Sequence, residues 1–192
     1  MADTPQAPTT PEAAEPAFVS DATISMERAN VIALFVLPLL PLLMGAHWLA
    51  WGGRSVVEGF RFLFPWWFFL LFFASIVVHE ALHAVGFLAV GRARRADVHF
   101  GIHRETLSPF AGCRAPLKAG AYRVAVLLPA LVLGVLPAAW GLATGTAWLT
   151  FWGAFMLVSA GGDFAALWAM RAVPNTARVL DHPERVGCRV VA

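Results

Sequence analysis

The sequence predicts an all-α integral membrane protein with four transmembrane helices and a small β-hairpin in the cytoplasmic loop between helices 2 and 3. The first observation is compositional: 59% of the 192 residues are hydrophobic, only 14% are charged, and the mean hydropathy is +0.68. Soluble domains carry about 25% charged residues. The second observation is that the apolar residues gather in four runs, each long enough for a membrane helix of about 20 residues.

The four spans are expected near residues 31–51, 62–90, 124–143 and 147–170. Lipid offers no water to backbone N–H and C=O groups, so each span must be helical. Prolines lie inside the first and third spans and should kink both helices. They are Pro38, Pro41, Pro129 and Pro137.

The polar ends divide the chain into three regions. Residues 1–28 are rich in Pro and Ala, and the first 27 contain no Lys or Arg, which predicts a disordered N-terminal tail and argues against a secretory signal. Residues 29–172 form the membrane domain. Residues 173–192 are expected to be an irregular cytoplasmic tail, packed near the candidate site described below.

The basic residues predict the orientation. Only Arg54 and Arg61 would lie on the outer side, whereas the other 12 of the 14 Lys and Arg residues share the side of both termini and of the 91–123 loop. The positive-inside rule therefore places both termini in the cytoplasm. The expected surroundings are a lipid bilayer. Nucleic acid is not an expected partner, because no basic run is interleaved with aromatic residues.

The loop after the second span has strand character. Apolar residues alternate with His and Gly over residues 98–103, which is the period of a β-strand. A second extended segment is expected over residues 106–113, completing the hairpin. Cys113 and Cys188 lie in no CxxC pair, and in a reducing cytoplasm both are expected to be free thiols.

The motif that can carry chemistry is His79-Glu80-Ala81-Leu82-His83, an HExxH sequence in the second span. Positions i and i+4 lie on one helix face, so the two imidazoles can bind one metal ion. Glu80 lies about 100° round the helix, close enough to act as general base on a metal-activated water. Ionisable groups at membrane depth cost about 2.5–3.5 kcal/mol each and are usually functional.

Asp163 in the fourth span is the candidate third metal ligand, since a catalytic zinc normally has three protein ligands. At 1.5 Å per residue, the two histidines and Asp163 lie at a similar depth, roughly 12–18 Å from the cytoplasmic surface. Gly161 and Gly162 should let the fourth helix approach the second closely. Zn²⁺, two carboxylates and two neutral imidazoles sum to zero charge, which suits a dry bundle. Alternatively, the histidines are hydrogen-bonded core residues and Asp163 is their neutral partner.

Four segments carry a resemblance to a known family: HEALHAVGF (79–87), GCRAPLKAGAYRVAVLLP (112–129), GGDFAAL (161–167) and DHPERVGC (181–188). Over about residues 30–190 the chain resembles the bacterial membrane family described as "putative zincin peptidase", a domain of unknown function. It is more distantly similar to site-2 protease-type intramembrane zinc metalloproteases. The resemblance implies His79, His83 and Asp163 as zinc ligands, Glu80 as general base, and the bacterial inner membrane as location.

Motif and resemblance together predict an intramembrane zinc metallopeptidase. It would hydrolyse a peptide bond of a peptide or membrane-protein substrate, in or near the membrane, by zinc-activated water with Glu80 as general base. The strand at residues 98–102 could present an edge to an extended substrate. One alternative is a non-catalytic scaffold or binding protein with a structural zinc clamp closed by a fourth ligand. A transporter is disfavoured by the lack of an evident inverted repeat. The pattern gives neither the oligomeric state nor the cleaved bond.

Other polar residues have simpler interpretations. His99 and His103 could bind a surface metal, but solvated loop residues are the simpler hypothesis. His47 is expected to be interfacial, at the outer end of the first span. The Asp181-His182-Pro183 segment is expected to form a turn, with coverage of the site from the cytoplasm as the alternative.

Overall fold

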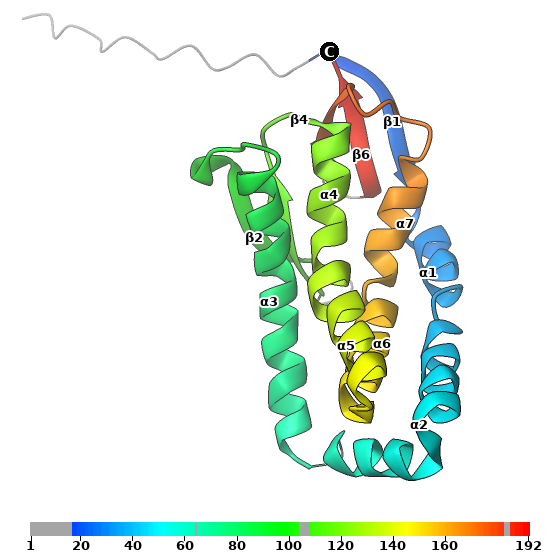
Figure 1. The fold of residues 1–192 in the computed structure, drawn as a ribbon. Coiled ribbons are helices and arrows are strands. Elements are labelled where there is room, and N and C mark those ends of the chain that lie inside the picture. Colours follow the sequence, from blue (N-terminus) through cyan, green and yellow to red (C-terminus); the bar gives the residue numbers. More distant parts are fainter. Residues whose placement is uncertain (1–16, 64, 104–107, 183–184) are drawn as a thin grey trace, which may run out of the picture.

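The helices stand side by side and a small β-sheet closes one end of the bundle (Figure 1). The structure is a computed structural model that describes residues 17–63, 65–103, 108–182 and 185–192. Its elements follow in chain order: β1 (Phe18–Ile24), α1 (Met26–Leu34), α2 (Leu39–Leu63), α3 (Trp67–Ala89), η1 (Arg95–Asp97), β2 (Val98–His103), β3 (Ser108–Cys113), β4 (Leu117–Lys118), α4 (Ala119–Pro129), η2 (Ala130–Val135), α5 (Leu136–Thr144), α6 (Ala147–Ser159), α7 (Gly161–Ala169), β5 (Arg178–Asp181) and β6 (Val186–Val191).

Within the described residues, three helical stretches are long and apolar enough to cross a membrane. They cover Met26–Arg61, Trp67–Ala89 and Ala119–Thr144. The number rises to four if α6 and α7, which meet at a 44° bend, form one span. Large apolar side chains are exposed along α1, α2, α3 and α5. Such a surface is compatible with lipid and not with water.

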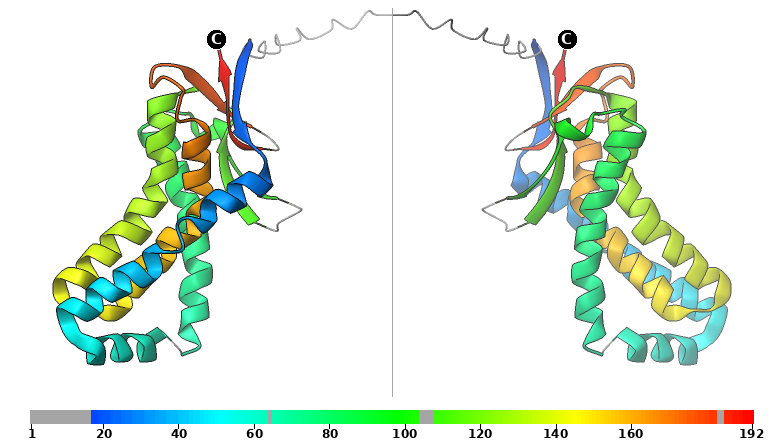
Figure 2. Two further views of the ribbon diagram at one scale, coloured as in Figure 1. Left: turned by 90° about the vertical axis from the view of Figure 1, so that its right-hand side faces the viewer. Right: turned by 90° about the vertical axis from the view of Figure 1, so that its left-hand side faces the viewer.

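The helix ends differ from the sequence expectation at the end of the bundle opposite the four-stranded sheet (Figure 1). The second span was predicted to begin at residue 62, but α2 runs on to Leu63 and α3 begins at Trp67. Gly52, with φ of 81°, interrupts α2. The C-terminal part of α2 lies across the end of the bundle (Figures 1 and 2). Glycine permits this left-handed conformation without a Cβ clash.

The third span accommodates its two prolines by changing locally from an α-helix to a π-helix. Pro129 ends α4, residues 130–135 form a π-helical stretch, and Pro137 lies in the first turn of α5. Proline lacks an N–H donor, and a wider π turn accommodates the missing i→i−4 bond. The span therefore continues through both prolines as one helical stretch.

The fold is mostly helical but not all-α, because it contains two antiparallel sheets. The β2–β3 hairpin confirms the prediction for the loop between α3 and α4. The second sheet, with strand order β1-β6-β5-β4, was not predicted. It corrects two expectations. Residues 18–24 of the supposed disordered tail form β1, and residues 178–181 and 186–191 of the supposed irregular tail form β5 and β6. Residues 1–16 lie outside the described part.

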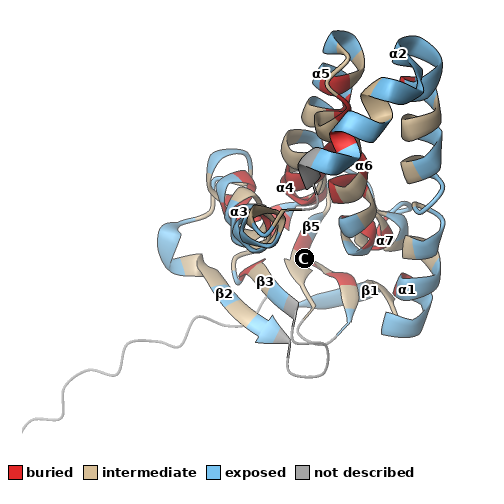
Figure 3. Ribbon diagram, turned by 90° about the horizontal axis from the view of Figure 1, so that it is seen from below, coloured by how far each residue is buried: buried red, intermediate tan, exposed pale blue. Residues whose placement is uncertain are grey.

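The buried core lies where α3 and α4 meet the sheets. Phe87, Tyr122 and Ala125 belong to one buried apolar cluster, together with Cys113 and Val179 from the strands. Figure 3 shows the buried residues on the inner faces of α3, α4 and α6, whereas α1 and α2 are largely exposed. The core therefore connects the C-terminal end of α3 and the N-terminal end of α4 to the small sheets.

His47 is buried inside the bundle rather than exposed at an interface. Its Nδ1 lies 2.9 Å from Thr150 Oγ1 and its Nε2 lies 3.0 Å from Ser55 Oγ. The Ser55 hydroxyl donates to the carbonyl oxygen of Gly145, so Ser55 Oγ must accept from His47 Nε2–H. Nδ1 then accepts from the Thr150 hydroxyl. This network fixes α2 against α6, and it places His47 inside the protein rather than on its surface.

Candidate metal centre

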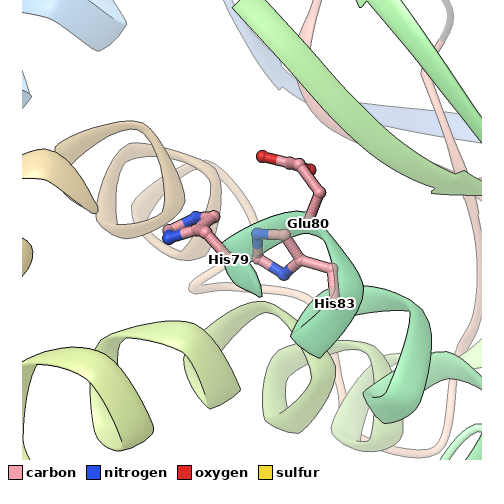
Figure 4. A group of neighbouring side chains, drawn as sticks. All are labelled: His79, Glu80 and His83. Atoms are coloured by element: carbon pink, nitrogen blue, oxygen red, sulfur yellow. The ribbon is translucent and has the colours of Figure 1, made fainter. Parts of the chain in front are cut away.

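The HExxH motif lies in the C-terminal half of α3. His79 and His83 are one helical turn apart, their ring centroids are 4.9 Å apart, and their planes are nearly perpendicular. One potential ligand atom from each of His79, Glu80 and His83 lies within 4.8 Å of the others. Figure 4 shows the three side chains close to one another on this part of α3. Among the described residues this is the group of three suited to a metal ion.

Asp163 joins this group from the other end of the sequence. One carboxylate oxygen lies 3.1 Å from His79 Nε2 and the other lies 3.3 Å from His83 Nε2. The side chains are 17%, 18% and 10% exposed for Asp163, His79 and His83. The structure therefore brings these three side chains together.

The break between α6 and α7 determines where Asp163 lies. The helix axis bends by 44° near Ala160, and Asp163 lies in the first turn of the new helix, α7. The positive end of the α7 dipole lies at this turn and stabilises a carboxylate there.

The glycines before Asp163 do not act as predicted. A Cβ at Gly161 would meet Ala33 of α1 at 2.6 Å, and a Cβ at Gly162 would meet nothing within 4 Å. Gly161 therefore allows α7 to approach α1. The close approach that serves the site is between α3 and α4, where a Cβ at Gly86 would lie 2.5 Å from Ala125 Cα.

That approach also orients His83. Its Nδ1 lies 3.1 Å from the carbonyl oxygen of Ala125. A carbonyl can only accept, so Nδ1 carries the hydrogen, and in the neutral ring Nε2 presents a lone pair toward Asp163. A backbone carbonyl on the far ring nitrogen is the usual partner of a metal-binding histidine.

The donor set fits a divalent metal ion. A lone pair on His83 Nε2 and an ionised Asp163 oxygen repel each other at 3.3 Å unless a proton or a cation lies between them. Asp163 Oδ2 is buried and accepts no hydrogen bond of acceptable geometry, although it lies 3.1 Å from His79 Nε2. Two imidazoles and a carboxylate are ligands that zinc accepts.

Glu80 lies on the side of α3 that faces the hairpin. Its carboxylate interacts with the backbone N–H of Ala111 on β3. In the β2–β3 register, Ala111 pairs with Phe100 and Cys113 pairs with Val98. The amides of Ala111 and Cys113 both point away from β2, toward α3 and β5. The strand next to Glu80 is therefore β3, and β2 lies beyond it.

Asp181 is the residue whose place the sequence interpretation missed. It ends β5, and its carboxylate accepts hydrogen bonds from the Cys113 backbone N–H at 2.6 Å and from the Tyr122 hydroxyl. Burial raises the pKa of Asp181 despite these two donors. Tyr122 lies one turn before Ala125 on α4. Asp181 therefore connects β3 with α4, the helix whose Ala125 carbonyl accepts the hydrogen bond from His83 of α3. The Asp-His-Pro segment was the available signal, and it was interpreted as a turn.

The remaining sequence candidates lie apart from this group. His99 on β2 is half-buried, its ring centroid is 5.8 Å from that of Phe110, and its Nδ1 has no hydrogen-bond partner. The side chain of His103 lies outside the described residues, as does Pro183. Cys113 and Cys188 are buried free thiols, which confirms that prediction. Burial raises the pKa of Cys188 to about 11.

The fold and the site define a class of protein: membrane-type helices that carry an HExxH group, as zincins do. The model of the family described as "putative zincin peptidase" matches residues 72–178, which is more than half of the chain, and the chain belongs to that family. The match includes α3 from residue 72 onward and Asp163, but it ends before Asp181. No curated protein and no solved structure matches the chain. The family and the His-Glu-His group indicate a metal site, and the family indicates a peptide substrate. The candidate membrane spans indicate contact with lipid.

Proposed function

We propose that the chain is an intramembrane zinc metallopeptidase with four membrane crossings and both termini in the cytoplasm. His79, His83 and Asp163 would hold the zinc ion, and Glu80 would be the general base. The observation that carries the proposal is the distance of 3.1 Å and 3.3 Å between the Asp163 carboxylate and the two Nε2 atoms, with Glu80 in the adjacent position. The family membership supports the reaction class.

Different residues of the chain would have different roles in peptide hydrolysis. A bound zinc ion supplies Lewis acidity, which lowers the pKa of water toward neutrality and polarises the scissile carbonyl. Glu80 takes the proton of the attacking water and later delivers it to the leaving amine. The Ala125 carbonyl keeps the imidazole of His83 in the tautomer that leaves Nε2 free. Asp163 supplies the negative charge that offsets part of the metal's charge.

The substrate must be locally extended, because a helix shields its own peptide bonds. We place it along the site-facing edge of β3 rather than along residues 98–102, since β3 lies between β2 and Glu80. The Ala111 N–H that now interacts with the Glu80 carboxylate is the donor nearest the site. A substrate carbonyl could accept this bond in its place, as in strand addition to a sheet edge.

The test is the variant Glu80→Gln in the purified full chain. The expected result is about one metal ion per chain by elemental analysis, as in the wild type, with cleavage of flexible membrane-spanning peptides lost by at least about 100-fold. The matched control is Glu58→Gln. Glu58 pairs with Arg54 on the exposed surface. Cleavage by the Glu80 variant at the wild-type rate would eliminate this mechanism.

A structural zinc clamp is the second candidate, and one observation favours it. The Glu80 ligand atom lies within 4.8 Å of those of both histidines, so Glu80 could close the site as a fourth ligand. Structural zinc sites are closed in this way. In that case Glu80→Gln would lower the metal content itself, whereas a general base can be removed with the metal retained.

A further inference from the structure

A partly open pocket of about 700 Å³ lies where the cytoplasmic ends of α3 and α4 meet the four-stranded sheet. Its apolar lining includes Val90, Leu117 and Ala121. Three cationic side chains line it as well: Arg92 from the end of α3, Lys118 from β4 and Arg178 from β5. The pocket thus combines an apolar floor with a positively charged rim.

The positive charges of the rim are not compensated by the protein. Lys118 and Arg178 lie directly opposite each other in the antiparallel β4–β5 pair. Like charges in this position destabilise a sheet. No acidic residue lines the pocket, and none of the ion pairs found in the described part of the chain involves its three cations. An anion in the pocket would convert this repulsion into attraction.

Arg92 supports the same conclusion through its backbone. Its φ is 56°, and among the described residues Arg92 is the only one other than glycine with a positive φ. A left-handed conformation costs a side-chain-bearing residue roughly 1–2 kcal/mol. Arg92 lies three residues after Ala89, the last residue of α3, in the turn that ends the helix, where glycine would be the ordinary choice for this backbone conformation. Strain of this kind persists where the surroundings fix it, often at ligand contacts.

The pocket lies at the depth of lipid headgroups. Its walls come from the ends of Trp67–Ala89 and Ala119–Thr144, both long and apolar enough to cross a membrane. We propose that this pocket binds the phosphate of an anionic phospholipid, with the acyl chains beside α3 and α4. A free phosphate ion would satisfy the charges but would leave the apolar lining in contact with water. The lipid accounts for both halves of the pocket.

The experiment titrates short-chain phosphatidylglycerol against the full chain in a neutral detergent and follows thermal unfolding by tryptophan fluorescence. The test variant is the double substitution K118Q/R178Q. Two cations near a phosphate contribute enough that we expect the apparent affinity to fall about thirtyfold. Without lipid, this variant should unfold at a temperature at least as high as the wild type, because the like-charge pair has been removed.

The matched control is R95Q/R114Q, which removes two exposed charges from the same end of the bundle but not from the pocket. Its affinity should stay within about threefold of the wild type. An equal loss in the control would show general attraction to charge and overturn the proposal. So would equal binding of phosphatidylcholine, or stabilisation by inorganic phosphate with none by the lipid.

Discussion

Gly86→Ala should damage the metal site through packing alone. The added Cβ would lie 2.5 Å from the Cα of Ala125. Carbon atoms pack at about 3.5–4.0 Å, so α3 and α4 would have to separate by roughly 1 Å. His83 Nδ1 donates to the Ala125 carbonyl oxygen at 3.1 Å, and the same separation would lengthen this contact beyond hydrogen-bonding distance. The free energy of unfolding should fall by about 1–3 kcal/mol, and the metal affinity by about 10–100-fold.

Two measurements on the purified full chain check this prediction: thermal unfolding, and competition for zinc with a calibrated chelator. Gly45→Ala is the matched control, because a Cβ at this helical glycine would meet nothing within 4 Å. The control should keep its metal affinity and gain up to about 1 kcal/mol in stability. If Gly86→Ala behaves like the control in both assays, the close contact between α3 and α4 does not position His83.

Three further predictions concern separate features. Asp163→Asn should abolish the rise in unfolding temperature that zinc gives to chelator-treated protein, worth about 4 kcal/mol in the wild type at 1,000 times the dissociation constant; an undiminished rise would remove Asp163 from the ligand set. Thr150→Val leaves His47 Nδ1 without a partner and should cost about 1–3 kcal/mol in thermal unfolding with unchanged metal content, so equal stability would refute the buried network. Burial raises the pKa of Cys188 from 9.0 to about 11, so the folded state holds this proton more tightly than the unfolded state. Stability should therefore be full below about pH 9 and fall by roughly 2–3 kcal/mol as the pH rises to 11. Cys188→Ala should flatten this slope, and an unchanged slope would show another group to be responsible.

The candidate site could be foreseen because helix geometry and membrane depth are local properties. The i, i+4 spacing of His79 and His83 specifies a shared face, and counting residues to the helix ends places Asp163 at a matching depth. The structure brings the Asp163 carboxylate within 3.1 Å and 3.3 Å of the two imidazoles. What depth could not give is the bend at Ala160, because it arises from how α6 and α7 pack on different neighbours.

The four-stranded sheet could not be foreseen, because its pairing is entirely non-local. β1 pairs with β6, which lies more than 150 residues away along the chain, and each strand is short. A short segment with mixed polarity has no strong period of its own, and its partner decides its conformation. Asp181 was misinterpreted for the same reason. Its donors, Tyr122 and the amide of Cys113, come from segments that only the folded chain brings together.

The sheet also fixes the parity of the membrane crossings. β1 precedes the first helix, β4 lies between α3 and α4, and β5 and β6 follow α7, yet all four strands belong to one hydrogen-bonded sheet. Strands that share hydrogen bonds must lie in the same compartment. An even number of passages must therefore separate β1 from β4, and again β4 from β5. In the proposed four-crossing arrangement the stretch from α4 to α5 makes one passage, and the bent pair α6–α7 would be the passage that returns the chain to the sheet, with Asp163 on it.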